Sequence, residues 1–317
     1  MLRQKRSLNL LFVGVGLVTG LLVARHFAAS GWPLRHANPW LVALAVAITF
    51  VSYAAKAWGW QRLFAGESRP AMLTLAAAGG AASVGGIALP GRCDEVLRVA
   101  VVRRCRRKRV GIGAVALSIF VLGLLDSVAL APLASVAAGV AGVAGWLEAG
   151  LIVVAVAGVA SAAVIATLPR LARIERVSRF RIARFVAEHV MPLRQASLAA
   201  LGVTVSWVLR TVAVFVLLAA VGLNADFALA LSFVCAASAS AVLPVAPAGA
   251  AVQAGAGAAI LASSGVHTDQ AVAFGVAAQG LSIVAGACCL LMLAAWHAHG
   301  RLTGLALRPA RLQPRSG

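Results

Sequence analysis

The stretch AMLTLAAAGGAASVGGIALPGRCDEVLRVAVVRRCRRKRV, residues 71–110, decides how the rest of the chain is interpreted. Its first half is small and apolar, Pro90 and Gly91 interrupt it, and charged residues follow directly after that break. The stretch is too interrupted and too charged for one helix that crosses a membrane. It predicts a re-entrant hairpin that turns at Pro90-Gly91. Because non-helical backbone at membrane depth is tolerated only beside protein or water, the turn also predicts a binding site.

The composition predicts an integral membrane protein. Hydrophobic residues make up 62% of the 317 residues, charged residues make up 12%, and the mean hydropathy is +0.94. A soluble globule of this length needs more polar surface. The net charge of +19 would suggest nucleic acid in a soluble protein, but here the basic residues lie between apolar runs. That placement is typical of the positive-inside rule, and no nucleic-acid partner is expected.

The hydropathy pattern predicts about six full transmembrane helices. The expected spans are 8–24, 40–60, 111–132, 150–168, 196–221 and 271–297. Nearly all Lys and Arg residues fall on the side of both termini, including a basic connector at 169–195, whereas the outer loops hold only Arg25 and Arg35. This asymmetry predicts a multi-pass protein of the inner or plasma membrane with cytoplasmic N- and C-termini.

A second broken apolar segment, residues 227–264, is interrupted by Pro244, Pro247 and Gly249. The order of span, broken hairpin and span thus occurs twice, at 40–132 and at 196–297, with opposite orientations. An inverted-topology repeat with paired broken helices is typical of alternating-access transporters, whose site lies near the bilayer midplane. The expected fold class is an all-α polytopic membrane protein in which residues 1–317 form a single integral membrane domain.

Two motifs resemble those of a known family. The run PGRCDEVLR at residues 90–98 resembles the "PGRxGExxR" signature of the lysylphosphatidylglycerol synthase transmembrane-region family, which is also described as flippase-like. The run LPVAPAGAAVQ at residues 243–253 is similar to its second signature, "PxxPGGxGxxE". The resemblance implies that the chain binds or moves phospholipids or other lipid-linked molecules. Only some members carry a soluble aminoacyl-transferase domain, and none is expected in the roughly twenty residues after the last span.

The chain departs from this family pattern at three positions. Asp94 stands where the first signature has glycine, Ala248 replaces a glycine of the second, and Gln253 replaces its glutamate. The loss of that carboxylate argues against a mechanism in which two symmetric acids bind a cation or relay protons.

The charges after Pro90-Gly91 give the first hairpin a chemical role. A helix that starts there directs its free N–H groups at an anion, and Arg92 and Arg98 add donors suited to phosphate. Asp94 and Glu95 could cap the helix, pair with these arginines or contact the amine of a headgroup. Alternatively, the segment is a basic loop whose arginines extend to the cytoplasmic surface. The expected substrate-binding residues are Arg92, Asp94, Glu95, Arg98, Pro247, Gly249 and Gln253.

Three charges fall inside the expected spans. Asp126 and Arg210 lie 15 and 14 residues beyond the starts of their spans, at a depth of about 21 to 23 Å, so they could meet. Lys56 and Arg210 stand 34 residues before Pro90 and Pro244 respectively, as corresponding positions of a repeat would. Lys56 could instead extend to the nearby cytoplasmic face. A static Asp126–Arg210 ion pair and a role in a translocation path both remain open.

The function expected from these features is lipid transport. A phospholipid or lipid-linked headgroup would bind in a midplane cavity and move between leaflets. The alternative is a non-transporting lipid-binding or scaffold protein that supports envelope lipid synthesis. The chain shows no motif for an enzyme, a cofactor or a metal, so none is expected. The oligomeric state stays open, a homo-oligomer included.

Overall fold

The computed structural model describes residues 36–64, 69–88, 93–104, 111–140, 145–171, 193–242 and 249–306, with the single residues 25, 32 and 34. Every secondary-structure element in these ranges is an α-helix, which confirms the all-α part of the expected fold class. The helices are α2 (Pro39–Gln61), α3 (Met72–Ala88), α4 (Cys93–Arg104), α5 (Ile112–Val140), α6 (Gly145–Leu171), α9 (Leu193–Ala220), α10 (Phe227–Val242), α11 (Gly249–Ser263) and α12 (Thr268–Ala306).

Within the described residues, five helices are long and apolar enough to cross a membrane: α2, α5, α6, α9 and α12. They correspond to five of the six expected spans, so the chain is a multi-pass membrane protein. The remaining expected span, residues 8–24, lies outside the described residues, as does most of the basic connector at 169–195.

One expected boundary is wrong. The third expected span ends at Pro132, but α5 continues through this proline to Val140. Proline removes one backbone hydrogen bond of the helix, and membrane helices tolerate this loss because neighbouring groups satisfy the freed carbonyl. Proline is therefore a weaker helix terminator here than in a soluble protein.

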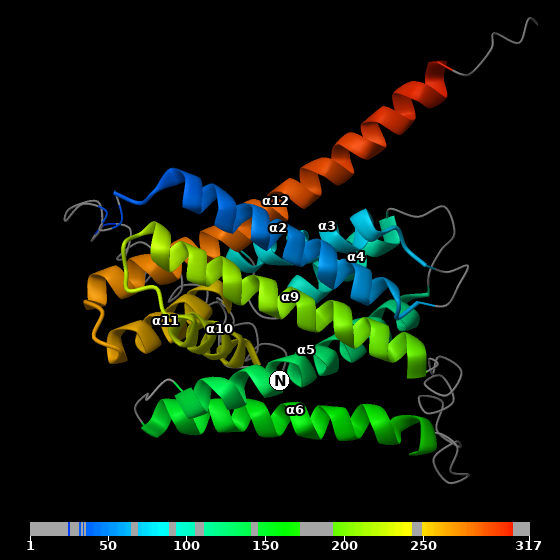
Figure 1. Ribbon diagram of the computed structural model, residues 1–317. Helices are drawn as coiled ribbons and strands as arrows, with labels where there is room; N and C mark the ends of the chain where they lie inside the picture. Colours follow the sequence, from blue (N-terminus) through cyan, green and yellow to red (C-terminus); the bar gives the residue numbers. More distant parts are fainter. Residues whose placement is uncertain are drawn as a thin grey trace, which may run out of the picture.

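The helices pack as one bundle around a central pair (Figure 1). Helices α2 and α9 lie along each other, α12 packs against α2 and α3, and α5 packs against α9 and α10. Helix α6 lies at the outer edge of the bundle against α5, and the C-terminal part of α12 projects away from it. The bundle thus brings the two expected repeats into contact along α2 and α9.

Short helices form at both broken segments, as the sequence predicts. Helix α3 ends at Ala88, before Pro90, and α10 ends at Val242, before Pro244. The arms α3 and α4 pack against each other, and so do α10 and α11. In Figure 1 the first pair lies toward one end of the central helices and the second pair toward the other. The turns that connect the arms, at 89–92 and 243–248, lie outside the described residues.

Local sequence fixes the ends of the central helices. The Asn38 side chain accepts hydrogen bonds from the amides of Trp40 and Leu41 at 3.0 and 3.4 Å, which caps α2. Helix α9 ends in a Schellman motif, in which Gly222 has a φ of 71° and the Leu223 amide bonds to the Leu218 carbonyl at 3.1 Å. The two ends meet, because the Asn38 amide donates to the Ala220 carbonyl at 2.7 Å.

Glycines bring the helices together at two crossings. A methyl group at Gly80 of α3 would lie 2.3 Å from the carbonyl oxygen of Gly286 in α12. A methyl group at Gly59 of α2 would lie 2.7 Å from the Ala199 carbonyl oxygen of α9, with Gly202 beside it. Because lipid tails give no hydrophobic driving force between membrane helices, such close backbone packing is a main source of their stability.

Candidate functional site

A partly buried ion pair joins helices α2 and α5. The Lys56 ammonium of α2 lies 2.8 Å from both carboxylate oxygens of Asp126 in α5. The two side chains are 17% and 20% exposed. An unpaired charge near the centre of a membrane helix costs on the order of 2.5 to 3.5 kcal/mol on insertion scales, so each charge offsets the cost of the other.

Trp207 of α9 completes the coordination of this carboxylate. Its indole Nε1 donates to Asp126 Oδ1 at 2.9 Å, and the Lys56 ammonium lies 5.4 Å from the centre of its ring. A charge-assisted hydrogen bond and a cation–π contact thus fix the same ion pair from a third helix. Helices α2, α5 and α9 are joined at this point.

Arg210 lies beside the pair without joining it. Its guanidinium is 5.0 Å from the centre of the Trp207 ring and 5.5 Å from the centre of the Tyr53 ring. The Nε of Arg210 is buried and has no hydrogen-bond partner. Within the described part of the chain, two aromatic rings and no carboxylate hold this cation. We call Tyr53, Lys56, Asp126, Trp207 and Arg210 the intramembrane charge cluster.

The sequence suggests Arg210 as the partner of Asp126, but the cation that contacts this carboxylate is Lys56. Depth along the helices correctly predicts that Asp126 and Arg210 lie near each other, but Lys56 takes the carboxylate. The Lys56 side chain does not extend outward along its helix, because its ammonium contacts Asp126 of α5.

The first helix pair contributes a further charge to this region. Arg98 of α4 and Arg210 of α9 both carry a positive charge whose electrostatic effect reaches Lys56. The Arg98 guanidinium is 3.7 Å from the Asp94 carboxylate one turn earlier, and its Nε is buried without a hydrogen-bond partner. Helix α4 thus adds an Arg98–Asp94 ion pair to the charges that α2, α5 and α9 contribute.

The first turn of α4 carries the two predicted acids, Asp94 and Glu95. Carboxylates there already complement the positive end of the helix dipole, which weakens the attraction of this helix start for a second anion. The anion-binding capacity of the region consequently rests on its arginine side chains. Arg92 and Pro247, two other predicted site residues, lie outside the described residues.

The second helix pair presents an amide where the family signature has an acid. Helix α11 begins at Gly249, and Gln253 lies one turn later. The Gln279 side chain of α12 donates to Gln253 Oε1 at 3.3 Å. Among the described residues, no hydrogen bond or ion pair joins Gln253 to the charge cluster.

Sequence reasoning missed Tyr53 and Trp207. The Tyr53 hydroxyl donates to the Ser282 carbonyl of α12 at 3.3 Å and shares a hydrogen bond with the Ser83 hydroxyl of α3. A signal for both aromatic residues was present, because VSYAAK at 51–56 and VSWVLR at 205–210 place an aromatic residue three positions before the intramembrane cation. Residues three apart share a helix face, so each ring points to the same side of its helix as its cation. Arg210 lies over its own Trp207, whereas Lys56 lies over Trp207 and the Tyr53 ring lies against Arg210.

The comparisons with known proteins identify the family. A family model described as the lysylphosphatidylglycerol synthase TM region matches residues 9–305. No curated protein and no solved structure gives a significant match to the chain. The family match covers nearly the whole sequence and includes both motifs at 90–98 and 243–253, which confirms the resemblance. The chain therefore belongs to the lysylphosphatidylglycerol synthase transmembrane-region family.

Proposed function

We propose that the protein binds a phospholipid or lipid-linked headgroup within the bundle and moves it between leaflets, without covalent change. The observation that carries this proposal is the intramembrane charge cluster with Arg98 beside it. Charged side chains inside a membrane protein are costly, and they mark substrate or ion pathways far more often than chance. A static scaffold needs the Lys56–Asp126 pair at most, whereas Arg210 adds a positive charge that no carboxylate in the described part of the chain neutralises, and Arg98 adds a second, partly buried guanidinium.

The headgroup enters this path at the first helix pair. Arg98 offers planar donors that match phosphate oxygens, and Arg92 lies six residues before it in sequence. Asp94 and Glu95 would contact the amine of a zwitterionic headgroup. The substrate class is thus an anionic or zwitterionic membrane lipid.

An inverted repeat would give this path two alternating openings, and the helix contacts support it. Under the correspondence of α2, α3, α4 and α5 with α9, α10, α11 and α12, contacts in one half have counterparts in the other. Helix α3 packs on α12 as α10 packs on α5, and α2 packs on α3 and α12 as α9 packs on α10 and α5. Likewise, α4 contacts α5 as α11 contacts α12.

The same correspondence relates the charges. Tyr53 and Lys56 become the counterparts of Trp207 and Arg210, each pair with the same spacing from the proline of the following broken segment. On this proposal the broken segments are re-entrant hairpins that enter from opposite sides. The basic residues then place both termini in the cytoplasm.

A non-transporting lipid-binding scaffold is the second candidate, and a transport assay separates the two. The purified protein is reconstituted into liposomes with a fluorescent phospholipid, and quencher added outside reports lipid arriving from the inner leaflet. Lipid movement above protein-free liposomes supports transport. Its absence, with lipid still bound, supports the scaffold.

The Arg98→Gln variant tests the site itself. A hydrogen bond to a charged group contributes roughly 1.5 to 3 kcal/mol, so the transport rate should fall about tenfold or more. Arg103→Gln is the matched control, because Arg103 lies on the same helix but is exposed. Equal rates for both variants would contradict the assignment of Arg98. Arg92→Ala should reduce transport as Arg98→Gln does.

A further inference from the structure

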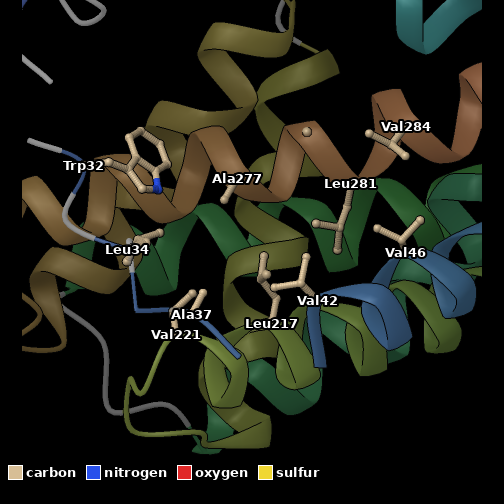
Figure 2. A pocket seen from close by; sticks show the side chains of 11 residues that line it. Trp32, Leu34, Ala37, Val42, Val46, Leu217, Val221, Ala277, Leu281 and Val284 are labelled. Carbon is tan, nitrogen blue, oxygen red and sulfur yellow. The ribbon is translucent and has the colours of Figure 1, made fainter. Parts of the chain in front are cut away.

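An apolar cavity of about 290 Å³ lies between α2, α9, α12 and the segment before α2 (Figure 2). Every side chain around it is aliphatic except that of Trp32. The lining residues are Trp32, Leu34, Ala37, Val42, Val46, Leu217, Val221, Ala277, Gly280, Leu281 and Val284. Its size is close to the lower limit of about 300 Å³ for small-molecule sites.

Gly280 keeps one wall of this cavity open. A methyl group built at Gly280 would meet no other atom within 4 Å, unlike a methyl group at Gly80 or Gly286. The glycine thus borders empty space, and helix packing does not require it to be small. A larger side chain at this position would fill the cavity without displacing a neighbouring helix.

The cavity lining and the charge cluster lie on neighbouring parts of the same helices. On α12, Leu281 and Val284 flank Ser282, whose carbonyl accepts the hydrogen bond from the Tyr53 hydroxyl. On α2, Tyr53 lies seven residues after Val46, which is two turns along the same face.

Helix α9 repeats this arrangement. Arg210 lies seven residues before the lining residue Leu217, about 10 Å along the same face of the helix. Its guanidinium lies over the Tyr53 ring. A cation without a carboxylate partner in the described part of the chain therefore lies about two helical turns from the wall of an apolar cavity, on the same helix face.

We propose that the cavity and Arg210 together bind one anionic phospholipid, with part of an acyl chain in the cavity and the phosphate at Arg210. The inference rests on the proposed function and names a binding site for its substrate. The cavity offers no polar side chain for a headgroup, apart from the Trp32 indole, so it selects the apolar part of the ligand. Arg210 supplies the selection for negative charge, because Lys56 is already neutralised by Asp126.

Photolabelling in nanodiscs tests the proposal. The probe is phosphatidylglycerol with a photoreactive group in its acyl chain, and diacylglycerol with the same chain is the uncharged reference. Peptides from α12 are then analysed by mass spectrometry. Phosphatidylglycerol should label the segment 277–284, and diacylglycerol should label it about tenfold less, which corresponds to about 1.4 kcal/mol. Equal labelling by the two probes would mean that the cavity takes up acyl chains without regard to the charge of the lipid, which would overturn the proposal.

Two substitutions test the acyl-chain cavity and the phosphate-binding arginine separately. Gly280→Leu should abolish labelling of 277–284, whereas the control Gly123→Leu, at an exposed glycine of α5 that also has open space, should leave it unchanged. Arg210→Gln should lower phosphatidylglycerol labelling to the diacylglycerol level, and Arg210→Lys should restore most of it. Persistent labelling in Gly280→Leu, or undiminished labelling in a folded Arg210→Gln protein, would overturn the proposal.

Two further measurements complete the test. Competition with inorganic phosphate distinguishes a lipid phosphate from free phosphate, and comparison of labelling with transport tests this inference separately from the proposed function. Inorganic phosphate at millimolar concentration should not displace the photolabel, since it lacks the chain; displacement would indicate a free-phosphate site and overturn the lipid assignment. Labelling without transport in liposomes would leave this site intact and refute the transport proposal. Transport without specific labelling would refute this inference alone.

Discussion

Replacing Asp126 by a neutral residue should destabilise the fold, because it leaves the Lys56 ammonium without its carboxylate partner. Removal of one partner from a buried ion pair leaves an unpaired charge, at a cost of about 3 to 5 kcal/mol. The two side chains keep about a fifth of their surface exposed, which favours the lower end, so Asp126→Asn should cost about 3 kcal/mol. Asparagine still accepts the hydrogen bond from Trp207. Asp126→Leu removes that acceptor as well and should cost about 1 kcal/mol more.

The assay is equilibrium unfolding in mixed detergent micelles, followed by tryptophan fluorescence and analysed as a double-mutant cycle. Adding Lys56→Met to Asp126→Asn should recover most of the lost stability, because no unpaired charge then remains and Trp207 can still donate its hydrogen bond to the asparagine. Arg210→Gln should cost only about 0.5 to 2 kcal/mol, the range of the cation–π contacts that it loses.

Two results would refute this reasoning. One is an Asp126→Asn protein within about 0.5 kcal/mol of the wild-type stability, which would mean that the carboxylate does not compensate a buried charge. The other is a larger coupling energy between Asp126 and Arg210 than between Asp126 and Lys56. That result would restore the pairing expected from depth alone.

Two further predictions concern the helix contacts and the second helix pair. Gly80→Val should destabilise the protein by about 1 to 3 kcal/mol, because the new side chain meets the Gly286 backbone, whereas Gly123→Val on an exposed face should be nearly neutral in unfolding titrations. Cysteines placed at Ser263 and Ser264 should react with a membrane-impermeant maleimide from outside intact cells; labelling only from the cytoplasm would reject the inverted repeat.

Apolar run length and the two proline-containing breaks were enough to predict most of the described fold. They locate the five candidate spans and the two helix pairs, because helix length and backbone satisfaction in a bilayer are strong constraints. The end of α5 was missed at Pro132, since tertiary contacts in a membrane bundle can satisfy the groups that proline leaves unpaired. Local rules therefore predict where helices occur better than where they end.

The partner of Asp126 could not be predicted in the same way. Residue counting gives depth along a helix axis, but the direction in which a side chain points depends on helix rotation and tilt. Those are set by packing at small residues such as Gly59 and Gly202, which sequence position alone does not reveal. The apolar cavity was missed for a related reason, because Gly280 marks a place where no neighbouring side chain fills the space.

The close crossing of α2 and α9 near Gly59 and Gly202 also determines how the bundle can move. Backbone atoms are in contact there, so the two helices cannot slide past each other without separating. Their relative motion must be a rotation about this crossing, which acts as a fulcrum. Val42, in the cavity wall, lies 17 residues from Gly59, about 25 Å along the helix. A tilt of a few degrees at the fulcrum would thus displace the cavity wall by ångströms and break the hydrogen bond from the Asn38 amide to the Ala220 carbonyl, while the charge cluster, much nearer the crossing, would barely shift.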